Sequence, residues 1–444
     1  MQTYFNEIAD NLHQLTESGE IYLAYLSAEE SNFVRFNHNA VRQAGSVKQL
    51  LLTISLIHNR RRADALVTLT CELDIDAPAC EAALKKLRLT LLEIPEDPYL
   101  IYNTSPVSSV NIGQSHLPSD DAMLSEIIGA GAGRDLVGIF ASGKMMKGFA
   151  NSLGQRNWHQ VENFNFDWCL YHAADKAVKN NYAGTHWDSQ VLRQKMDSAI
   201  AALAVLTLPP KTLSPGQYRA YLTPSALNEM MGLLSWGGFG EKSQRNKQSP
   251  LMKLQHTGRD GTVNLHPSIT LTESAKDGVA PLFNADGFMK TDEVTLIREG
   301  KHMGALISPR SAKEFSLATN GANNSEAPES LSMRAGTLKR DEVLATLDTG
   351  IFVSNLWYLN YSDRGNCRMT GMTRFATFWV ERGEIVAPIN VMRFDDSIYR
   401  MLGENLIGLT AERDWLLDAG SYGERSSGAA KLPGAVVQDF QLTL

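Results

Sequence analysis

Residues 21–57 constrain the possible fold more than any other segment. Alternating and β-branched apolar residues dominate this stretch, and two small groups, Glu29-Glu30-Ser31 and Ala44-Gly45-Ser46, interrupt it. Alternation of this kind, broken by turn-forming residues, is typical of antiparallel strands joined by hairpins. The segment therefore predicts three antiparallel strands, and it favours a sheet as the basis of the N-terminal fold.

Helical spacing appears on both sides of this expected sheet. Apolar residues three and four positions apart predict an amphipathic helix over residues 3–18 and another over residues 76–92. Pro95 and Pro98 prevent the second helix from continuing. A sheet covered by helices is an α+β layer, which is the fold class we expect for the N-terminal part.

The rest of the chain changes character near residue 210. A short helix is expected over residues 119–131. The glycines at its end are interpreted as a turn and not as a nucleotide-binding loop, because such a loop would be followed by a helix. A long helix is expected over residues 188–204, and short strands and turns dominate after residue 218. We therefore expect an N-terminal α+β domain over residues 1–210 and a larger, β-rich, barrel-like domain over residues 211–444.

The composition excludes several classes of protein. Of 444 residues, 43% are hydrophobic and 20% are charged, which is typical of a globular protein with a sizeable core. The 42 basic residues are outnumbered by 49 acidic ones, and this net charge of −7 argues against nucleic-acid binding. The basic run at residues 60–62 is interpreted as a solvated loop or strand end. No apolar run reaches the ~18 residues that cross a membrane, and no signal pattern opens the sequence, so we expect a cytoplasmic protein.

Motifs that would carry chemistry on their own are missing from the sequence. None of the ten histidines has a partner four residues away, as a zinc-binding helix would need, and the four cysteines form no C-x-x-C pair. The sequence also has no G-x-S-x-G elbow and no Walker A loop. Residue types and spacing alone therefore indicate no self-sufficient catalytic site.

A resemblance to a known family rests on three stretches that occur in order. The first is the helix and strands through residues 34–38, with the prolines at 95–98. The second is the pair Asp286-Gly287, followed by residues 294–300. The third consists of residues 350–353, Gly365-Asn366, Thr370-Gly371 and residues 378–388. Together these stretches resemble the TldD/PmbA (TldE) family of intracellular peptidase subunits, over nearly the whole chain. The resemblance implies two domains, of which the C-terminal one forms a channel that holds a peptide.

The same resemblance implies a metal site that this chain lacks. Metal-bearing members carry HExxxH on a helix, and a cysteine near the C-terminus adds a third ligand. The matching helix here is residues 224–234, in which Asn228 and Leu233 stand at the ligand positions and Glu229 stands where the general base stands. The cysteine position falls near Tyr422. An amide, an aliphatic chain and a phenol do not assemble a zinc site, so we expect no metal in this chain and zinc in a TldD-like partner.

The resemblance to the PmbA/TldE side predicts a non-metal subunit of a peptidase system that acts on unfolded peptides or leader peptides. Its expected partner is a metal-bearing TldD-like subunit or a second copy of itself, and catalysis by the chain alone is not expected. The aromatic and polar residues of the signature region are candidate peptide contacts, with ordinary strand packing as the alternative: Trp357, Tyr361, Arg364 and Asn366.

Two other readings stay open at the level of the sequence. The first is a stand-alone peptide-binding or scaffold protein, acting as a homodimer without a role in proteolysis. The second is a metal-dependent peptidase with other ligands, such as His256 and His266, which could meet across a hairpin but have no evident third ligand.

Overall fold

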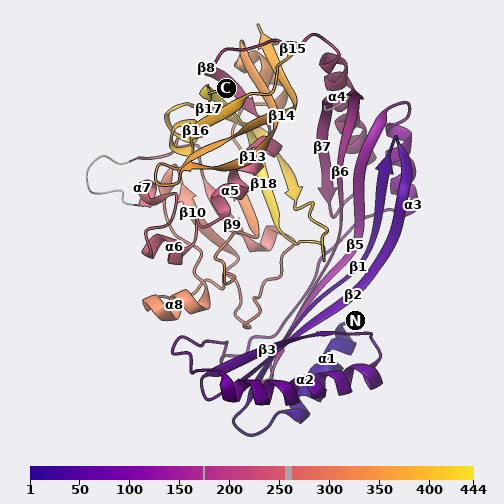
Figure 1. The fold of residues 1–444 in the computed structure, drawn as a ribbon, viewed down its shortest axis with the longest axis vertical. Coiled ribbons are helices and arrows are strands. Elements are labelled where there is room, and N and C mark those ends of the chain that lie inside the picture. Colours follow the sequence, from indigo (N-terminus) through magenta and orange to yellow (C-terminus); the bar gives the residue numbers. More distant parts are fainter. Residues whose placement is uncertain (174–175, 256–262) are drawn as a thin grey trace.

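The computed structural model of the protein describes residues 1–173, 176–255 and 263–444. These residues form two β-sheets, both accompanied by helices (Figure 1). The strands of the first sheet all precede residue 185, and those of the second all follow residue 215. The expected α+β fold class is therefore confirmed. None of the helices in the described ranges is long and apolar enough to cross a membrane.

Within these ranges, seven strands form the first sheet in the order β3-β2-β1-β5-β6-β4, with β7 also paired to β6. Neighbouring strands are antiparallel except for β4 and β6, which are parallel. The elements of this half are α1 (Gln2–Leu15), β1 (Ile21–Asn37), β2 (Ala40–His58), β3 (Arg61–Thr68), α2 (Leu73–Glu93), β4 (Ser109–Ile112), α3 (Asp120–Ala130), β5 (Asp135–Asn151), β6 (Arg156–Ala173), β7 (Lys176–Gly184) and α4 (Ser189–Leu206).

Helices lie at both ends of the long strands of this sheet (Figure 1). At one end, Phe5 of α1 and Leu84 of α2 are buried against β1, β2 and β5. At the other end, Ile127 of α3 and Met196 of α4 pack with aromatic residues of β5 and β6. Phe378, from the second sheet, belongs to this same cluster. The two sheets therefore share part of their hydrophobic core.

The prediction of three strands between residues 21 and 57 is wrong. The structure has two long strands, β1 and β2, joined by a tight turn at His38 and Asn39. Both turn residues have positive φ angles, 50° and 56°, as the central residues of a type I′ hairpin turn require. The groups at residues 29–31 and 44–46, expected as turns, stay paired within the strands.

Buried contacts explain why polar residues interrupt β1 without ending it. Glu29 is only 4% exposed, and it accepts hydrogen bonds from Gln49 Nε2 (2.6 Å) and Ser31 Oγ (3.0 Å). The backbone N–H of Arg425, from the other half of the chain, also donates to Glu29 (3.4 Å). A buried carboxylate needs donors of this kind. These polar residues therefore mark a contact between the two halves.

In the described part of the C-terminal half, eleven strands form the second sheet. Five of them pair in a closed circle, from β8 through β13, β14, β16 and β18 back to β8, so the sheet is partly ring-like. The strands are β8 (Gly216–Leu222), β9 (Leu271–Ser274), β10 (Glu293–Arg298), β11 (Lys301–His302), β12 (Ser330–Met333), β13 (Gly350–Asp363), β14 (Arg368–Glu381), β15 (Glu384–Pro388), β16 (Arg393–Ser397), β17 (Leu406–Leu417) and β18 (Ala429–Leu442). The helices are α5 (Pro224–Ser235), α6 (Glu241–Arg245), α7 (Met252–Gln255), α8 (Pro309–Phe315) and α9 (Val343–Leu347).

Helix α5 begins directly after β8, and local chemistry fixes its start. Thr223 caps the helix by accepting a hydrogen bond from the Ala226 N–H (3.2 Å), and Pro224 occupies the first turn, where no N–H is needed. One face buries Leu227 and Met230 completely in the main core of the C-terminal half. The opposite face is left free of this core.

The segment between β17 and β18 reaches across to the first sheet. Arg425 in this segment is 6% exposed, and its guanidinium donates to Ser31 Oγ (3.4 Å), to the carbonyl oxygen of Gly143 (3.4 Å) and to both oxygens of Asn163. Burial lowers the pKa of Arg425 to about 10, although the nearby Glu29 favours the charged form. These acceptors lie on β1, β5 and β6, so one side chain joins three strands to the other half.

Gly143 provides a test of this arrangement, because its φ angle is 135° and an added Cβ would lie 2.1 Å from the carbonyl oxygen of Glu30. We expect Gly143→Ala to lower the free energy of unfolding by about 1–3 kcal/mol or more, through backbone strain and the forced separation of β1 from β5. Gly45→Ala in β2 is the matched control, since no atom lies within 4 Å of its added Cβ. Urea unfolding measures both. Equal stability of the two variants would contradict the close approach at Gly143.

Candidate functional site

In the described part of the chain, two of the cavities between the N-terminal and C-terminal halves are of ligand-binding size and are lined by several charged residues each. One, of about 660 Å³, lies beside β3, α6 and α8, and we call it the junction cavity. The other, of about 400 Å³, lies over the free face of α5, and we call it the α5 cleft. The α5 cleft contains the helix that the family resemblance places at the metal-binding position.

The floor of the α5 cleft is one face of a helix. Ser225, Asn228, Glu229, Gly232 and Ser235 line it, and their spacing of three and four residues puts them on one side of α5. The walls come from distant segments of both halves: Asp167 of β6, Lys179, Asn180 and Asn181 of β7, Asn355 of β13, and residues at 416–419 and 428–430.

The electrostatics of the cleft centre on Glu229. Its carboxylate faces the open cleft, and the described residues offer it no ion pair within 4 Å, because Lys179 Nζ pairs with Asp167 (3.3 Å). Partial burial by the cleft walls raises the pKa of Glu229; Lys179 opposes this rise and Asp167 adds to it. Burial also raises the pKa of Asp167, against the effect of Lys179. Raised carboxyl pKa values in a cleft are typical of functional sites.

Asn355 adds an unsatisfied hydrogen-bond acceptor to the same cleft. Its side chain is 7% exposed, and its Oδ1 atom has no hydrogen-bond partner among the described residues. Buried polar atoms without partners are rare in folded proteins and call for an explanation. A ligand that donates a hydrogen bond would provide one.

The structure brings only part of the predicted metal position together. Asn228 and Glu229 line the cleft, but Leu233 is half-buried and packs against the core of the C-terminal half. Tyr422 is fully exposed, and it does not line the cleft, although Asp418 of the same segment does. The described residues contain no group of three or more His, Cys, Asp or Glu side chains placed to hold one metal ion. The donor set at the predicted positions does not fit zinc.

The four predicted peptide contacts lie outside the residues that line this cleft. Arg364 donates from Nε to the Gln248 carbonyl oxygen and from Nη2 to that of Trp236 (both 2.8 Å), and it stacks on the Tyr361 ring. The Tyr361 hydroxyl in turn donates to the Leu233 carbonyl oxygen (3.1 Å).

The other two of these residues have different surroundings. Asn366 is exposed and hydrogen-bonds Asp363, while Trp357 is 48% exposed beneath the Arg374 guanidinium (4.5 Å to the ring centre). Arg364 and Tyr361 thus hold the loop after α5, and peptide contact by any of the four stays a prediction. His256 lies outside the described residues. His266 Nδ1 contacts Ser268 Oγ (2.7 Å).

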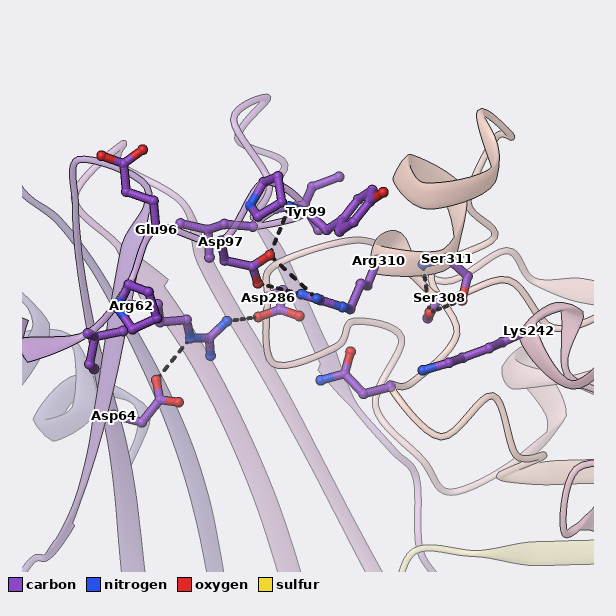
Figure 2. Close-up of a pocket in the computed structure, with 16 residues that line it drawn as sticks. Arg62, Asp64, Glu96, Asp97, Tyr99, Lys242, Asp286, Ser308, Arg310 and Ser311 are labelled. Carbon is purple, nitrogen blue, oxygen red and sulfur yellow. Dashed lines mark hydrogen bonds and ion pairs between the residues drawn. The ribbon is translucent and has the colours of Figure 1, made fainter. Parts of the chain in front are cut away.

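The charged groups of the junction cavity are largely paired with one another. Figure 2 shows Arg62 between Asp64 (2.9 Å) and Asp286 (2.5 Å), and Arg310 beside Asp97 (2.6 Å). The basic run at residues 60–62 had been interpreted as a solvated loop or strand end. Arg62 of this run is instead paired with carboxylates inside the junction cavity. Since these pairs connect β3 and the segment after α2 to the C-terminal half, the cavity marks a contact between the halves.

Comparison with known proteins decides the family. The model of the PmbA/TldA metallopeptidase C-terminal domain matches residues 215–444, which is more than half of the chain. The chain belongs to the PmbA/TldD family. This confirms the resemblance, and it makes the chain a protein of the TldD/PmbA peptidase-system type. No curated protein matches the chain.

Solved structures share the whole fold at low sequence identity. TldE from Thermococcus kodakarensis is similar with a TM-score of 0.80 and 13% identity, covering 99% of this chain and 100% of that one. A protein from Thermotoga maritima has a TM-score of 0.76 and 13% identity, with the same coverage. One from Bacteroides thetaiotaomicron has a TM-score of 0.72 and 14% identity, covering 99% and 98%. At these identities the likeness shows the PmbA/TldD fold alone.

Sequence reasoning missed the walls of the cleft. Asp167, Lys179 and Asn355 carry no local motif. Asp167 and Lys179 meet α5 only through the packing of the two halves, whereas Asn355 meets it through the packing of α5 on β13. Asn355 lies in the strand that begins the strongest family stretch, where the polar pair Ser354-Asn355 interrupts the apolar residues and was the available signal.

The raised pKa of Glu229 predicts how its charge affects stability. The fold favours the neutral form, so this contribution to stability is present below the ordinary pKa of a glutamate and is lost as the pH rises through the higher folded value. We expect Glu229→Gln to be as stable as the wild type, or more stable, at about pH 8, and the difference to vanish near pH ~4.

Urea unfolding at the two pH values measures the effect. Glu93→Gln, at an exposed site at the end of α2, controls for the loss of one negative charge. A Glu229→Gln variant that is clearly less stable than the wild type at the higher pH would contradict the predicted direction.

Proposed function

We propose that this chain is the non-metal subunit of a TldD/PmbA peptidase system and that its α5 cleft holds an extended segment of an unfolded peptide. The observation that carries the proposal is the position of α5. The helix that the family resemblance assigns to the metal-binding position lines a cleft, where it presents an amide at Asn228 and a carboxylate at Glu229, and its Leu233 packs against the core.

The walls of the cleft suit the main chain of a peptide. Among the described strands β7 pairs only with β6, and three of its residues line the cleft. An extended peptide can add to such a strand through main-chain hydrogen bonds, which tolerate many side chains. The side-chain amides of Asn181, Asn228 and Asn355 can donate to or accept from peptide groups of any sequence.

The chemistry of the cleft supports a holding role rather than independent hydrolysis. A zinc ion would supply an activated water, but the residues at the expected ligand positions offer no imidazole or thiolate to bind it. In this proposal a metal-bearing TldD-like partner supplies the catalytic zinc, and this chain positions the peptide.

Metal content and peptide cleavage test the subunit role together. We expect the purified chain to bind only substoichiometric zinc and to leave an unfolded peptide intact. Co-expression with a metal-bearing relative from the same genome should give a complex that cleaves the peptide. Stoichiometric zinc with cleavage in the isolated chain would contradict the proposal. A homodimer that never associates with such a relative would instead favour the stand-alone binding protein.

Blocking the cleft tests the peptide-holding role. Gly232 lies on the cleft face of α5, and no atom lies within 4 Å of a Cβ added there, so a large side chain can be accommodated by extending into the cleft. We expect Gly232→Phe to weaken the binding of a fluorescein-labelled unstructured peptide by about tenfold or more, a change of about 1.4 kcal/mol. Fluorescence anisotropy measures the affinity.

Gly129→Phe is the matched control for this substitution. Gly129 is also a helical glycine with no atom within 4 Å of an added Cβ, but it lies in α3, away from the cleft. Equal peptide affinity of the two variants would mean that the peptide binds elsewhere.

A further inference from the structure

The α5 cleft carries an excess of negative charge. Of the described residues that line it, three have carboxylates, Asp167, Glu229 and Asp418, and only Lys179 is a cation. The Lys179 ammonium is already paired with Asp167 (3.3 Å). Glu229 and Asp418 therefore remain without a cationic partner in the cleft, and together they favour a positively charged ligand.

Asn355 is a second feature of the cleft that suits a ligand with hydrogen-bond donors. Its Oδ1 atom is an acceptor without a partner among the described residues, on a side chain that is 7% exposed. An acceptor needs an N–H or O–H donor. Ammonium and guanidinium groups combine positive charge with several N–H donors, so one such group can meet both requirements.

The junction cavity shows the contrasting case. There the carboxylates of Asp64, Asp97 and Asp286 each have an arginine within 3 Å, as Figure 2 shows for the pairs with Arg62 and Arg310. Those charges are neutralised inside the protein and stabilise the contact between the halves. The unpaired carboxylates of the α5 cleft, by contrast, are left for a ligand.

We propose that the α5 cleft binds a cationic nitrogen group of the peptide, with Glu229 supplying the opposite charge and Asn355 the buried acceptor. The substrate class is therefore a peptide that places a lysine or arginine side chain, or its own terminal ammonium, in the cleft. This inference rests on the proposed peptide-holding function and adds a preference for charge to it.

The test compares unstructured peptides that differ by one group. The probes are a peptide with acetylated and amidated ends and one central norleucine, and the same peptide with lysine or glutamate at that position. A third arm is the norleucine peptide with a free N-terminus. We expect the lysine peptide to bind about tenfold more tightly than the norleucine peptide, and the glutamate peptide to bind most weakly.

Variants of the chain assign the preference to the cleft. Glu229→Gln should lower the affinity for the lysine peptide toward that for the norleucine peptide, so that the ratio of the two affinities approaches one. Asn355→Leu, which removes the acceptor, should also reduce the advantage of lysine. Glu93→Gln, which removes the same charge from an exposed site on α2, should leave the advantage intact.

The outcomes separate this inference from the function on which it rests. If the acetylated lysine and norleucine peptides and the free-terminus peptide all bind the wild type equally, the charge preference is overturned and the peptide-holding role stands. If only the free terminus strengthens binding, the cationic site holds and the ligand is the peptide terminus rather than a side chain. If no peptide binds, both the proposed function and this inference fail.

Discussion

The buried guanidinium of Arg425 fixes the segment between β17 and β18 on the first sheet. Removing an arginine charge from water costs several kcal/mol unless hydrogen bonds replace its hydration. Ser31, Gly143 and Asn163 provide those bonds from three strands of the first sheet. The segment between β17 and β18 therefore stays packed on the first sheet only while these strands keep their positions. Glu29 and Ser31 of β1 serve this contact, whereas the glycine at position 143 of β5 is required by its close approach to the Glu30 carbonyl oxygen.

The α5 cleft follows from the same contact. Because Arg425 holds its segment on the first sheet, Asp418 and Gly428 of that segment lie at the wall of the cleft, opposite α5. Further parts of the wall come from β6, β7 and Asn355 of β13, so segments far apart in sequence enclose one space. A peptide in the cleft would contact both halves at once, and the cleft exists only while the halves stay together.

The sequence predicted what depends on local pattern and missed what depends on distant contacts. The helices α1, α2 and α4 were expected within a few residues of their observed bounds, because their apolar spacing and caps are local signals. The hairpin of β1 and β2 was misread, since Glu29 is buried by a contact with Arg425, almost 400 residues away. Asn228 and Glu229 were singled out through the family resemblance, whereas Asn355 could be recognised only from the packing of α5 on β13.

In helix α5, the residues that stabilise the fold differ from Glu229, which lines the cleft. Its packing is carried by Leu227, Met230, Met231 and Leu234, each at most 1% exposed, and its start is fixed by Thr223. None of these requires a carboxylate at position 229. Since partial burial disfavours the charged form of Glu229, folding alone would be served better by a neutral residue there. A carboxylate that opposes stability at this position fits a binding role, and the unpaired acceptor of Asn355 lies in the same cleft.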